Sequence, residues 1–393
     1  MTRSYPFGRD RLNPDPQYAL LRRSEPVSRV QLAYGPPAWL VTNYELTRAV
    51  LGDARFSRAA VIGRDSPRES PVDIGQLAES ITNMDPPAHT RIRKLVSRAF
   101  TPRRVEEMRP RVQEIASGLV DEMMAAGPPA DLVESFSFPL PSIVICELLG
   151  VPEADRQTFR GWADAAISTT KAPAEEQESF LHLAGYLAGQ FAQRRTDPQD
   201  DLLTWLVQAR DDGDQLSETE LLVLGMAVLV AGYETTARQI ANMVYTLLMH
   251  PARLAELRSR PELVPAAVEE LLRFIVFASA INPRIATADV QLGSVLVREG
   301  EPVLCSRSSA NRDESMFARP DELDFGRDPN PHMAFGYGPH FCLGANLARM
   351  ELQVSVGTLL SRMPELRMAV PEESLSWQTG IFLRGLAAFP IAW

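Results

Sequence analysis

One cysteine in this sequence stands where it could act as a metal ligand. Cys342 follows a run rich in glycine and aromatic residues, 335–341, and precedes an apolar, helix-patterned stretch from Leu343 to Leu360. The amino terminus of a helix carries unpaired N–H groups and partial positive charge, so it favours a thiolate over a thiol. A buried thiolate needs a positive partner, and a metal ion is the usual one.

Three interpretations of Cys342 are open from these residues alone. A lone cysteine is most often a small core residue. Zinc would need further ligands at short spacing, yet only His340 is near, and the other cysteines, Cys146 and Cys305, are far away in the sequence. A single thiolate in a loop lined by aromatic residues and glycines fits an axial haem ligand better.

A second group of reactive side chains interrupts the longest apolar run. Residues 217–220, Ser-Glu-Thr-Glu, form a capping box, and the apolar residues 221–230 that follow predict a helix buried on all sides. The run is broken at 231–236 by Ala-Gly-Tyr-Glu-Thr-Thr. These polar groups cost stability in a core, so they indicate a buried polar network, a kink or a site for a small oxygen ligand.

The elements that would position these groups are mainly helical. Asp85-Pro86-Pro87 predicts a helix start, and His89 and Arg93 then lie on one helix face at i, i+4. Patterns and prolines predict further helices at 15–22, from 44, 101–124, 138–149, 153–167, 174–195 and 200–209. Short strands are expected at 27–31, 39–41, 281–286, 290–293, 295–297, 302–304, 366–370 and 389–393.

Composition limits the class of protein. The chain has 393 residues, 45% of them hydrophobic, and a net charge of −10, which argues against a nucleic-acid binder. The amino terminus shows no apolar targeting or membrane-spanning segment, and three cysteines without pairing spacing suggest a reducing compartment. We therefore expect a cytoplasmic protein that does not bind membranes.

The pattern Phe-Gly-x-Gly-x-His-x-Cys-x-Gly at 335–344 resembles the haem-binding loop of the cytochrome P-450 superfamily at every fixed position. The segments at 85–93 and 231–235 are similar to two further motifs of that family, and Glu270-x-x-Arg273 resembles a third. The resemblance covers nearly the whole chain. It implies one domain, 1–393, that is mainly α with a minor β region: a helical prism with haem between the long buried helix and the Cys-loop helix.

The resemblance also implies a cofactor and its contacts. The cofactor is haem b, with Cys342 as its axial ligand, and four basic residues would bind its propionates: His89, Arg93, Arg284 and His332. The remaining expected contacts are Ala231, Gly232, Phe335, Gly336, His340, Gly344 and Ala345. Glu270 and Arg273 would hold the segment leading to the cysteine loop, a structural role.

The implied activity is monooxygenation with O₂ as co-substrate. Thr235 would donate a hydrogen bond to the oxygen ligand, Glu234 would relay protons, and Gly232 would let the helix loosen. Electrons would come ultimately from NAD(P)H through a ferredoxin reductase and a ferredoxin. The ferredoxin would dock on a basic patch, whose alternative interpretation is a solvated basic face: Arg91, Lys94, Arg98, Arg103, Arg104 and Arg349.

Within the family the chain resembles actinobacterial enzymes that tailor antibiotics, particularly macrolide hydroxylases and epoxidases. The expected pocket residues are mostly apolar and suit a bulky, largely apolar small molecule: Ile81, Met84, Val228, Ala231, Phe277, Ala278, Ile281 and Phe382. The same lining would suit an aromatic, peptide-like substrate such as a cyclic dipeptide, with oxidative coupling instead of oxygen insertion. A non-catalytic helper of a partner enzyme is a further alternative.

Overall fold

The computed structural model of the chain describes residues 2–8, 10–69, 76–158, 161–162, 173–211, 216–280, 282–379 and 383–393. The chain forms two compact units. We call residues 1–90, 265–343 and 382–384 the β-sheet unit, and residues 91–264, 344–381 and 385–393 the helical unit. That the two units make one domain over 1–393 stays a prediction.

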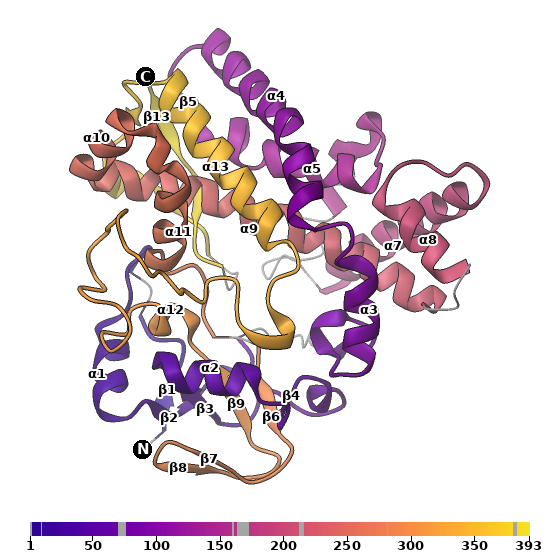
Figure 1. Cartoon of the computed structure of the whole chain (residues 1–393), viewed down its shortest axis with the longest axis vertical. Helices are drawn as coiled ribbons and strands as arrows, with labels where there is room; N and C mark the ends of the chain where they lie inside the picture. The colour runs from indigo at the N-terminus through magenta and orange to yellow at the C-terminus, as the bar shows by residue number, and fades with distance from the viewer. Residues whose placement is uncertain are drawn as a thin grey trace. The chain divides into compact units, whose positions relative to one another are not determined.

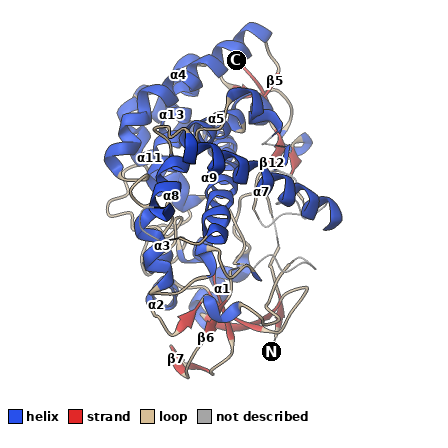
Figure 2. Ribbon diagram, turned by 90° about the vertical axis from the view of Figure 1, so that its right-hand side faces the viewer, coloured by secondary structure: helices blue, strands red, loops and turns tan. Residues whose placement is uncertain are grey.

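The β-sheet unit is built on a six-stranded sheet with the strand order β1-β2-β3-β9-β6-β4. Its strands are β1 (Arg3–Ser4), β2 (Val27–Gln31), β3 (Ala38–Val41), β4 (Phe56–Ser57), β6 (Arg284–Ala286) and β9 (Pro302–Cys305). β3 pairs antiparallel with β2 and parallel with β9, so Val30, Leu40 and Val303 lie fully buried in the sheet. β7 (Val290–Leu292) and β8 (Val295–Val297) form a separate hairpin in this unit (Figures 1 and 2).

Four helices complete the β-sheet unit: α1 (Pro16–Ser24), α2 (Tyr44–Gly52), α12 (Arg307–Ala310) and most of α11 (Val264–Phe274). Local sequence explains where they start. The side chains of Asp15 and Asn43 accept hydrogen bonds from the first-turn N–H groups of α1 and α2, and Ser306 does the same for α12. Helix α3 (Ala88–Val96) begins in this unit and ends in the helical unit.

The helical unit contains the long helices. They are α4 (Pro102–Ala126), α5 (Pro139–Leu149), α7 (Pro173–Thr196), α8 (Leu202–Asp211), α9 (Glu218–Met249), α10 (Pro251–Ser259) and α13 (Ala345–Arg362). Helix α13 packs along α4, and α9 packs along α5 (Figure 1). Two small antiparallel sheets belong to this unit: β10 (Arg367–Met368), β13 (Pro390–Ala392) and β5 (Ala130–Asp131), and the pair β11 (Ser376–Trp377) and β12 (Leu386–Ala388).

Helix α9 carries the interrupted apolar run. The capping box at Ser217 and Glu220 is present, but the helix continues through 231–236 to Met249 without a break. Gly232 is needed for packing, because a β-carbon there would lie 2.8 Å from Cδ1 of Ile145 on α5. α9 is also long and apolar enough to cross a membrane, a test that core helices pass too, and 65% of its most apolar window is buried.

The mainly α fold with a minor β region is confirmed, and the expected helices at 15–22, 101–124, 138–149, 174–195 and 200–209 correspond to α1, α4, α5, α7 and α8. Of the helix expected at 153–167, residues 159–160 and 163–167 lie outside the described residues. The strand expected to start at Ile281 begins at Arg284 instead, and Ile281 is itself outside the described residues.

Candidate haem-thiolate site

The cysteine loop lies in the β-sheet unit and is folded back on itself. The N–H of Cys342 donates to the carbonyl of Phe335 at 2.8 Å. Gly338 adopts a φ of +72° and passes so close to α2 that a β-carbon there would meet the carbonyl oxygen of Leu51 at 2.6 Å. The loop therefore presents Cys342 at an exposed position, flanked by the aromatic rings of Phe335 and Phe341, whose centroids are 6.4 Å apart.

Two imidazole rings contact each other at a tilt of 43° beside this loop. The ring centroids of His89 and His340 are 4.3 Å apart, and His89 is buried. Burial, followed by the positive charges of Arg284 and His89, lowers the pKa of His340 to about 3. His340 is therefore neutral at physiological pH and can donate one hydrogen bond.

Three arginines surround the same loop, of which Arg58 and Arg284 are buried and Arg307 is half-buried. Arg284 on β6 donates to the carbonyl of Phe56 at 3.0 Å, and burial lowers its pKa. Arg58 donates to the carbonyls of Thr82 and Pro283 and to Asn83. Arg307, the first residue of α12, approaches Gly336 of the loop. The sequence prediction missed Arg58 and Arg307, because only the pairing of β4, β6 and β9 brings them to the loop.

His332 has a different partner from the one expected. Its Nε2 lies 2.9 Å from a carboxylate oxygen of Glu269, and its Nδ1 accepts the N–H of Ala334. This arrangement fixes the imidazole between the end of α11 and the segment before the loop. The predicted propionate contact of His332 stays a prediction, now with a competing carboxylate beside it.

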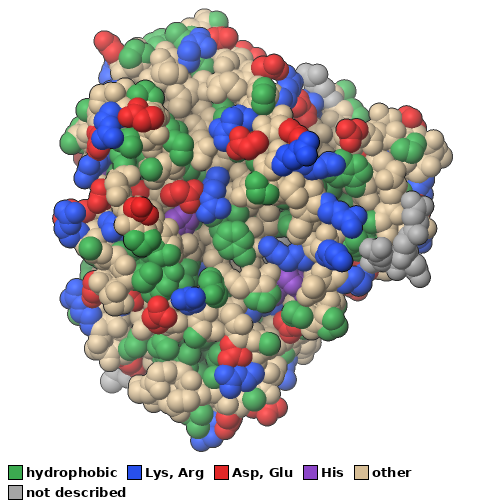
Figure 3. Space-filling view, in the orientation of Figure 1, with side chains coloured by type: hydrophobic (Ala, Val, Ile, Leu, Met, Phe, Trp, Pro, Cys, Tyr) green, Lys and Arg blue, Asp and Glu red, His purple; other side chains and the backbone are tan. Residues whose placement is uncertain are grey.

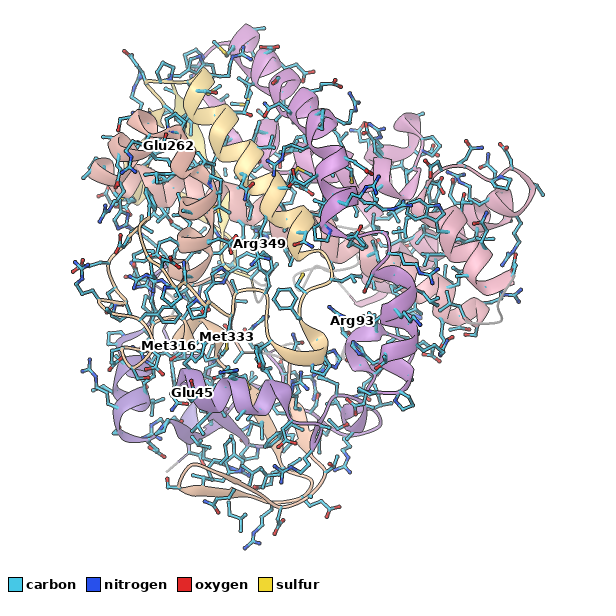
Figure 4. All side chains as sticks on the ribbon, in the orientation of Figure 1. Glu45, Arg93, Glu262, Met316, Met333 and Arg349 are labelled. Carbon is cyan, nitrogen blue, oxygen red and sulfur yellow. The ribbon has the colours of Figure 1, made fainter. Side chains whose placement is uncertain are left out.

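Glu270 and Arg273 form a buried ion pair at 2.7 Å, as their spacing predicts. Arg273 also donates to the carbonyls of Asn311, Pro320 and Glu322, and Glu270 accepts from Arg327. The side-chain oxygen of Asn311 accepts a hydrogen bond from the N–H of Met333, which Figure 4 labels in the segment leading to the loop. These bonds fix the chain between α12 and the cysteine loop.

The reactive residues of α9 lie in the helical unit. The hydroxyl of Thr235 donates to the carbonyl of Ala231 at 2.9 Å, so it is held against its own helix. Glu234 is buried and accepts a hydrogen bond from Arg238, one turn later, at 2.6 Å. The sequence prediction missed Arg238, although its i, i+4 spacing from Glu234 was a readable signal.

The other predicted contacts divide between the units. Arg93, labelled on α3 in Figure 4, and Gly344 and Ala345 at the start of α13 belong to the helical unit. Of the expected pocket residues, Met84 and Val228 are buried, Ile81, Phe277 and Ala278 are half-buried, and Ala231 is exposed. Ala278 forms a β-bridge with Leu383 in the β-sheet unit. Ile281 and Phe382 lie outside the described residues.

The residues of the β-sheet unit fit a haem. A single cysteine is presented from a glycine-containing loop, which suits an axial thiolate. Beside it, within the described part of the chain, neither Arg284 nor Arg307 forms an ion pair, although burial lowers the pKa of both. Buried cations need anionic partners, and the two carboxylates of haem b supply them. A fold that offers this donor set is that of a haem-thiolate protein.

Comparison with known proteins identifies the family. Residues 129–373 match the family Cytochrome P450. The chain is 49% identical over 394 residues to mycinamicin IV hydroxylase/epoxidase of Micromonospora griseorubida, covering 100% of this chain and 98% of that protein. It is 51% identical over 396 residues to nocardicin C N-oxygenase of Nocardia uniformis subsp. tsuyamanensis, covering 100% and 99%.

A solved structure gives the same result. The crystal structure of cytochrome P450mel 107F1 with biaryl coupling reactivity matches with a TM-score of 0.94 and 47% identity over 100% of both chains. The chain belongs to the cytochrome P450 family. It is a monooxygenase that uses O₂, its cofactor is haem with a cysteine thiolate ligand, and its electrons come ultimately from NAD(P)H.

Proposed function

We propose that this monooxygenase inserts one oxygen atom, by hydroxylation or epoxidation, into a bulky and largely apolar natural product such as a macrolide or other polyketide. The observation that carries the proposal is the identity of 49% with a macrolide-named hydroxylase/epoxidase over the whole chain. Apolar residues at most of the expected pocket positions, such as Met84, Val228 and Phe277, suit such a ligand.

The chain's own residues have distinct roles in this proposal. Cys342 would ligate the iron, His89, Arg93, Arg284 and His332 would hold the propionates, and His340 would be a further contact of the cofactor. When bound, the haem supplies the activation of O₂. The hydroxyl of Thr235 donates to the carbonyl of Ala231 at 2.9 Å, and on turning away from it the hydroxyl would be able to donate a hydrogen bond during the activation of O₂.

Glu234 is the proton carrier of the proposal. Its buried carboxylate accepts a hydrogen bond from Arg238 at 2.6 Å, and in this proposal it takes up a proton and passes it on. Release of that proton toward Thr235, the next residue, needs the contact with Arg238 to loosen, because the guanidinium favours the charged carboxylate.

The electron donor in this proposal is a ferredoxin, docked on the basic patch of the helical unit, and the protein is cytoplasmic. The structure distinguishes the members of the patch. Arg91 is paired with Glu220, Arg103 is paired with Glu107, and Arg104 stacks on Trp205 at 3.9 Å. Lys94 and Arg98 are exposed and carry no ion pair within the described ranges, so they contribute most of the net field.

Substrate binding tests the proposal. We expect members of a macrolide and polyketide panel to convert the haem from low to high spin in a type I spectral titration, and a product one oxygen atom heavier than the substrate. Spectral shifts confined to other compound classes would overturn the macrolide or polyketide assignment.

Oxidative coupling of aromatic, peptide-like substrates is the second candidate, favoured by the 47% identity with an enzyme of biaryl coupling reactivity. Aromatic cyclic dipeptides belong in the same panel for this reason. Coupling gives a product two hydrogens lighter than its substrates, so mass spectrometry separates the two reactions.

A further inference from the structure

A third arginine, outside the set that the family resemblance assigns to the cofactor, faces the cysteine loop. Strand β9 ends at Cys305, Ser306 caps the short helix α12, and Arg307 is its first residue. A β-carbon placed on Gly336 would lie 3.7 Å from Nη1 of Arg307. Gly336 adjoins Phe335, whose carbonyl binds the N–H of Cys342 at 2.8 Å, so the guanidinium lies against the loop that carries the thiolate.

The surroundings of Arg307 lack a fixed anion. In the described part of the chain its guanidinium has no salt bridge and no hydrogen bond, in contrast to those of Arg273 and Arg312, which are paired with Glu270 and Asp321. Burial lowers the pKa of Arg307, and only the thiols of Cys342 and Cys305 oppose that shift. Arg307 is half-buried, and a half-buried guanidinium without a carboxylate partner is a ready binding site for an anion.

Arg307 does not stand alone. Arg284 on β6 pairs with β9 at Val303, and both arginines act electrostatically on Cys305 at the end of β9. One guanidinium on β6 and one at the start of α12 thus lie near Cys305 and the loop, and their planar forks match carboxylates.

We infer that Arg307 is an additional positioning residue for the haem: its guanidinium binds a propionate carboxylate and so anchors the cofactor beside the cysteine loop. The inference rests on the propionate-binding part of the proposed function. It assigns to Arg307 a cofactor contact that neither the sequence motifs nor the named relatives indicate. A cation at this place stabilises the reduced, less positively charged haem relative to the oxidised one, so its loss shifts the reduction potential to more negative values.

The test compares purified holoenzymes with Arg307→Gln, Arg307→Lys and Arg298→Gln. Arg298 is an exposed residue of the β7–β8 hairpin and is paired with Asp289. Its substitution removes one positive charge from the surface and leaves the cysteine loop unchanged. We expect haem transfer to excess apomyoglobin to become about tenfold faster in Arg307→Gln, the order of one lost charge-assisted bond, and the midpoint potential to fall. Arg307→Lys should recover most of the loss, and Arg298→Gln should match the wild type.

Reconstitution with haem dimethyl ester, whose propionates carry no charge, isolates the contact. With the ester, Arg307→Gln and wild type should release the cofactor at equal rates, as in a double-mutant cycle. Transfer rates within twofold of wild type for Arg307→Gln with ordinary haem, or an equal acceleration with the ester, would overturn the inference. The reduced CO difference spectrum of the wild type tests the proposed function on its own. If the band typical of a thiolate ligand is absent there, the assignment of Cys342 as the iron ligand fails, whatever the role of Arg307.

Discussion

At the scale of single residues, buried charges in this chain serve two different ends. Arg194 and Asp201 form a buried ion pair at 2.7 Å, and Arg194 also donates to the carbonyl of Gly150 at 2.6 Å. This charge is satisfied within the helical unit and supports the fold. Arg284 and Arg307 lack such carboxylates in the described part of the chain, which is why we connect them with the cofactor.

Gly150 is the residue on which that structural ion pair depends. It ends α5 with a φ of +75°, and a β-carbon there would lie 2.0 Å from Oδ2 of Asp201. We expect Gly150→Ala to lower the free energy of unfolding by ~3 kcal/mol, because it breaks a buried pair and forces a residue with a β-carbon into a left-handed conformation. Urea denaturation followed by circular dichroism measures this.

Gly189→Ala is the matched control for Gly150→Ala. Gly189 lies inside α7 with open space around its α-carbon. Alanine should leave stability unchanged or raise it by up to about 1 kcal/mol. Equal effects of the two substitutions would contradict the role of Gly150.

Thr235 tests the proton path of the proposed function. Replacing it by alanine removes the hydroxyl next to Glu234, and we expect the product formed per O₂ consumed to fall at least about tenfold, with peroxide released instead. Thr236→Ala is the comparison, since Thr236 also bonds to its own helix, at the carbonyl of Gly232. If coupling survives in Thr235→Ala and fails in Thr236→Ala, the relay runs through Thr236.

At the scale of elements, α13 carries a buried acid. Glu351 is 1% exposed, its Oε2 has no hydrogen-bond partner in the described structure, and burial alone raises its pKa well above 4.5. The folded state therefore holds Glu351 protonated at pH values where the unfolded chain has released the proton. The contribution of Glu351 to the free energy of unfolding is therefore fully present below about pH 4.5. It is lost progressively as the pH rises toward the pKa of Glu351 in the folded state.

Glu351→Gln should remove that pH dependence. The urea midpoint of the variant relative to wild type should be higher at pH 8 than at pH 5, because only the wild type must retain a proton on folding at the higher pH. Glu365→Gln, an exposed acid just after α13, should show the same difference at both pH values. A relative midpoint for Glu351→Gln that does not change with pH would mean that the carboxyl is ionised in the folded state.

Element starts were predictable from sequence where local chemistry sets them. Helices α1, α2 and α9 begin within two residues of their predicted first residues, because each is capped by a polar side chain directly before it: Asp15, Asn43 and Ser217. The packing of Gly232 against Ile145 on α5 was not predictable, because the two residues are far apart in the sequence. Partners distant in sequence, such as Glu269 for His332, depend on tertiary packing and leave no periodic signal.

At the scale of the whole molecule, basic residues gather in one region although the net charge of the chain is negative. The chain carries a net charge of −10, yet basic residues gather on α3, α4 and the start of α13 in the helical unit. Figure 3 shows blue side chains interleaved with red ones over this face, in keeping with the ion pairs of Arg91 and Arg103. The field left for a partner therefore comes mainly from the unpaired members, Lys94 and Arg98.

Charge reversal at those two residues tests docking of the electron donor. In the double variant Lys94→Glu and Arg98→Glu, we expect kcat/KM for a ferredoxin to fall about tenfold at low salt, because electrostatic attraction mainly speeds encounter, and its dependence on ionic strength to flatten. Turnover driven by hydrogen peroxide, which needs no electron donor, should be unchanged and so controls for folding and haem binding. Arg298→Glu on the β7–β8 hairpin changes the net charge in the same sense and should leave the ferredoxin kinetics nearly intact. If the double variant keeps both the rate and the salt dependence of the wild type, the partner docks elsewhere and the basic face is only solvated.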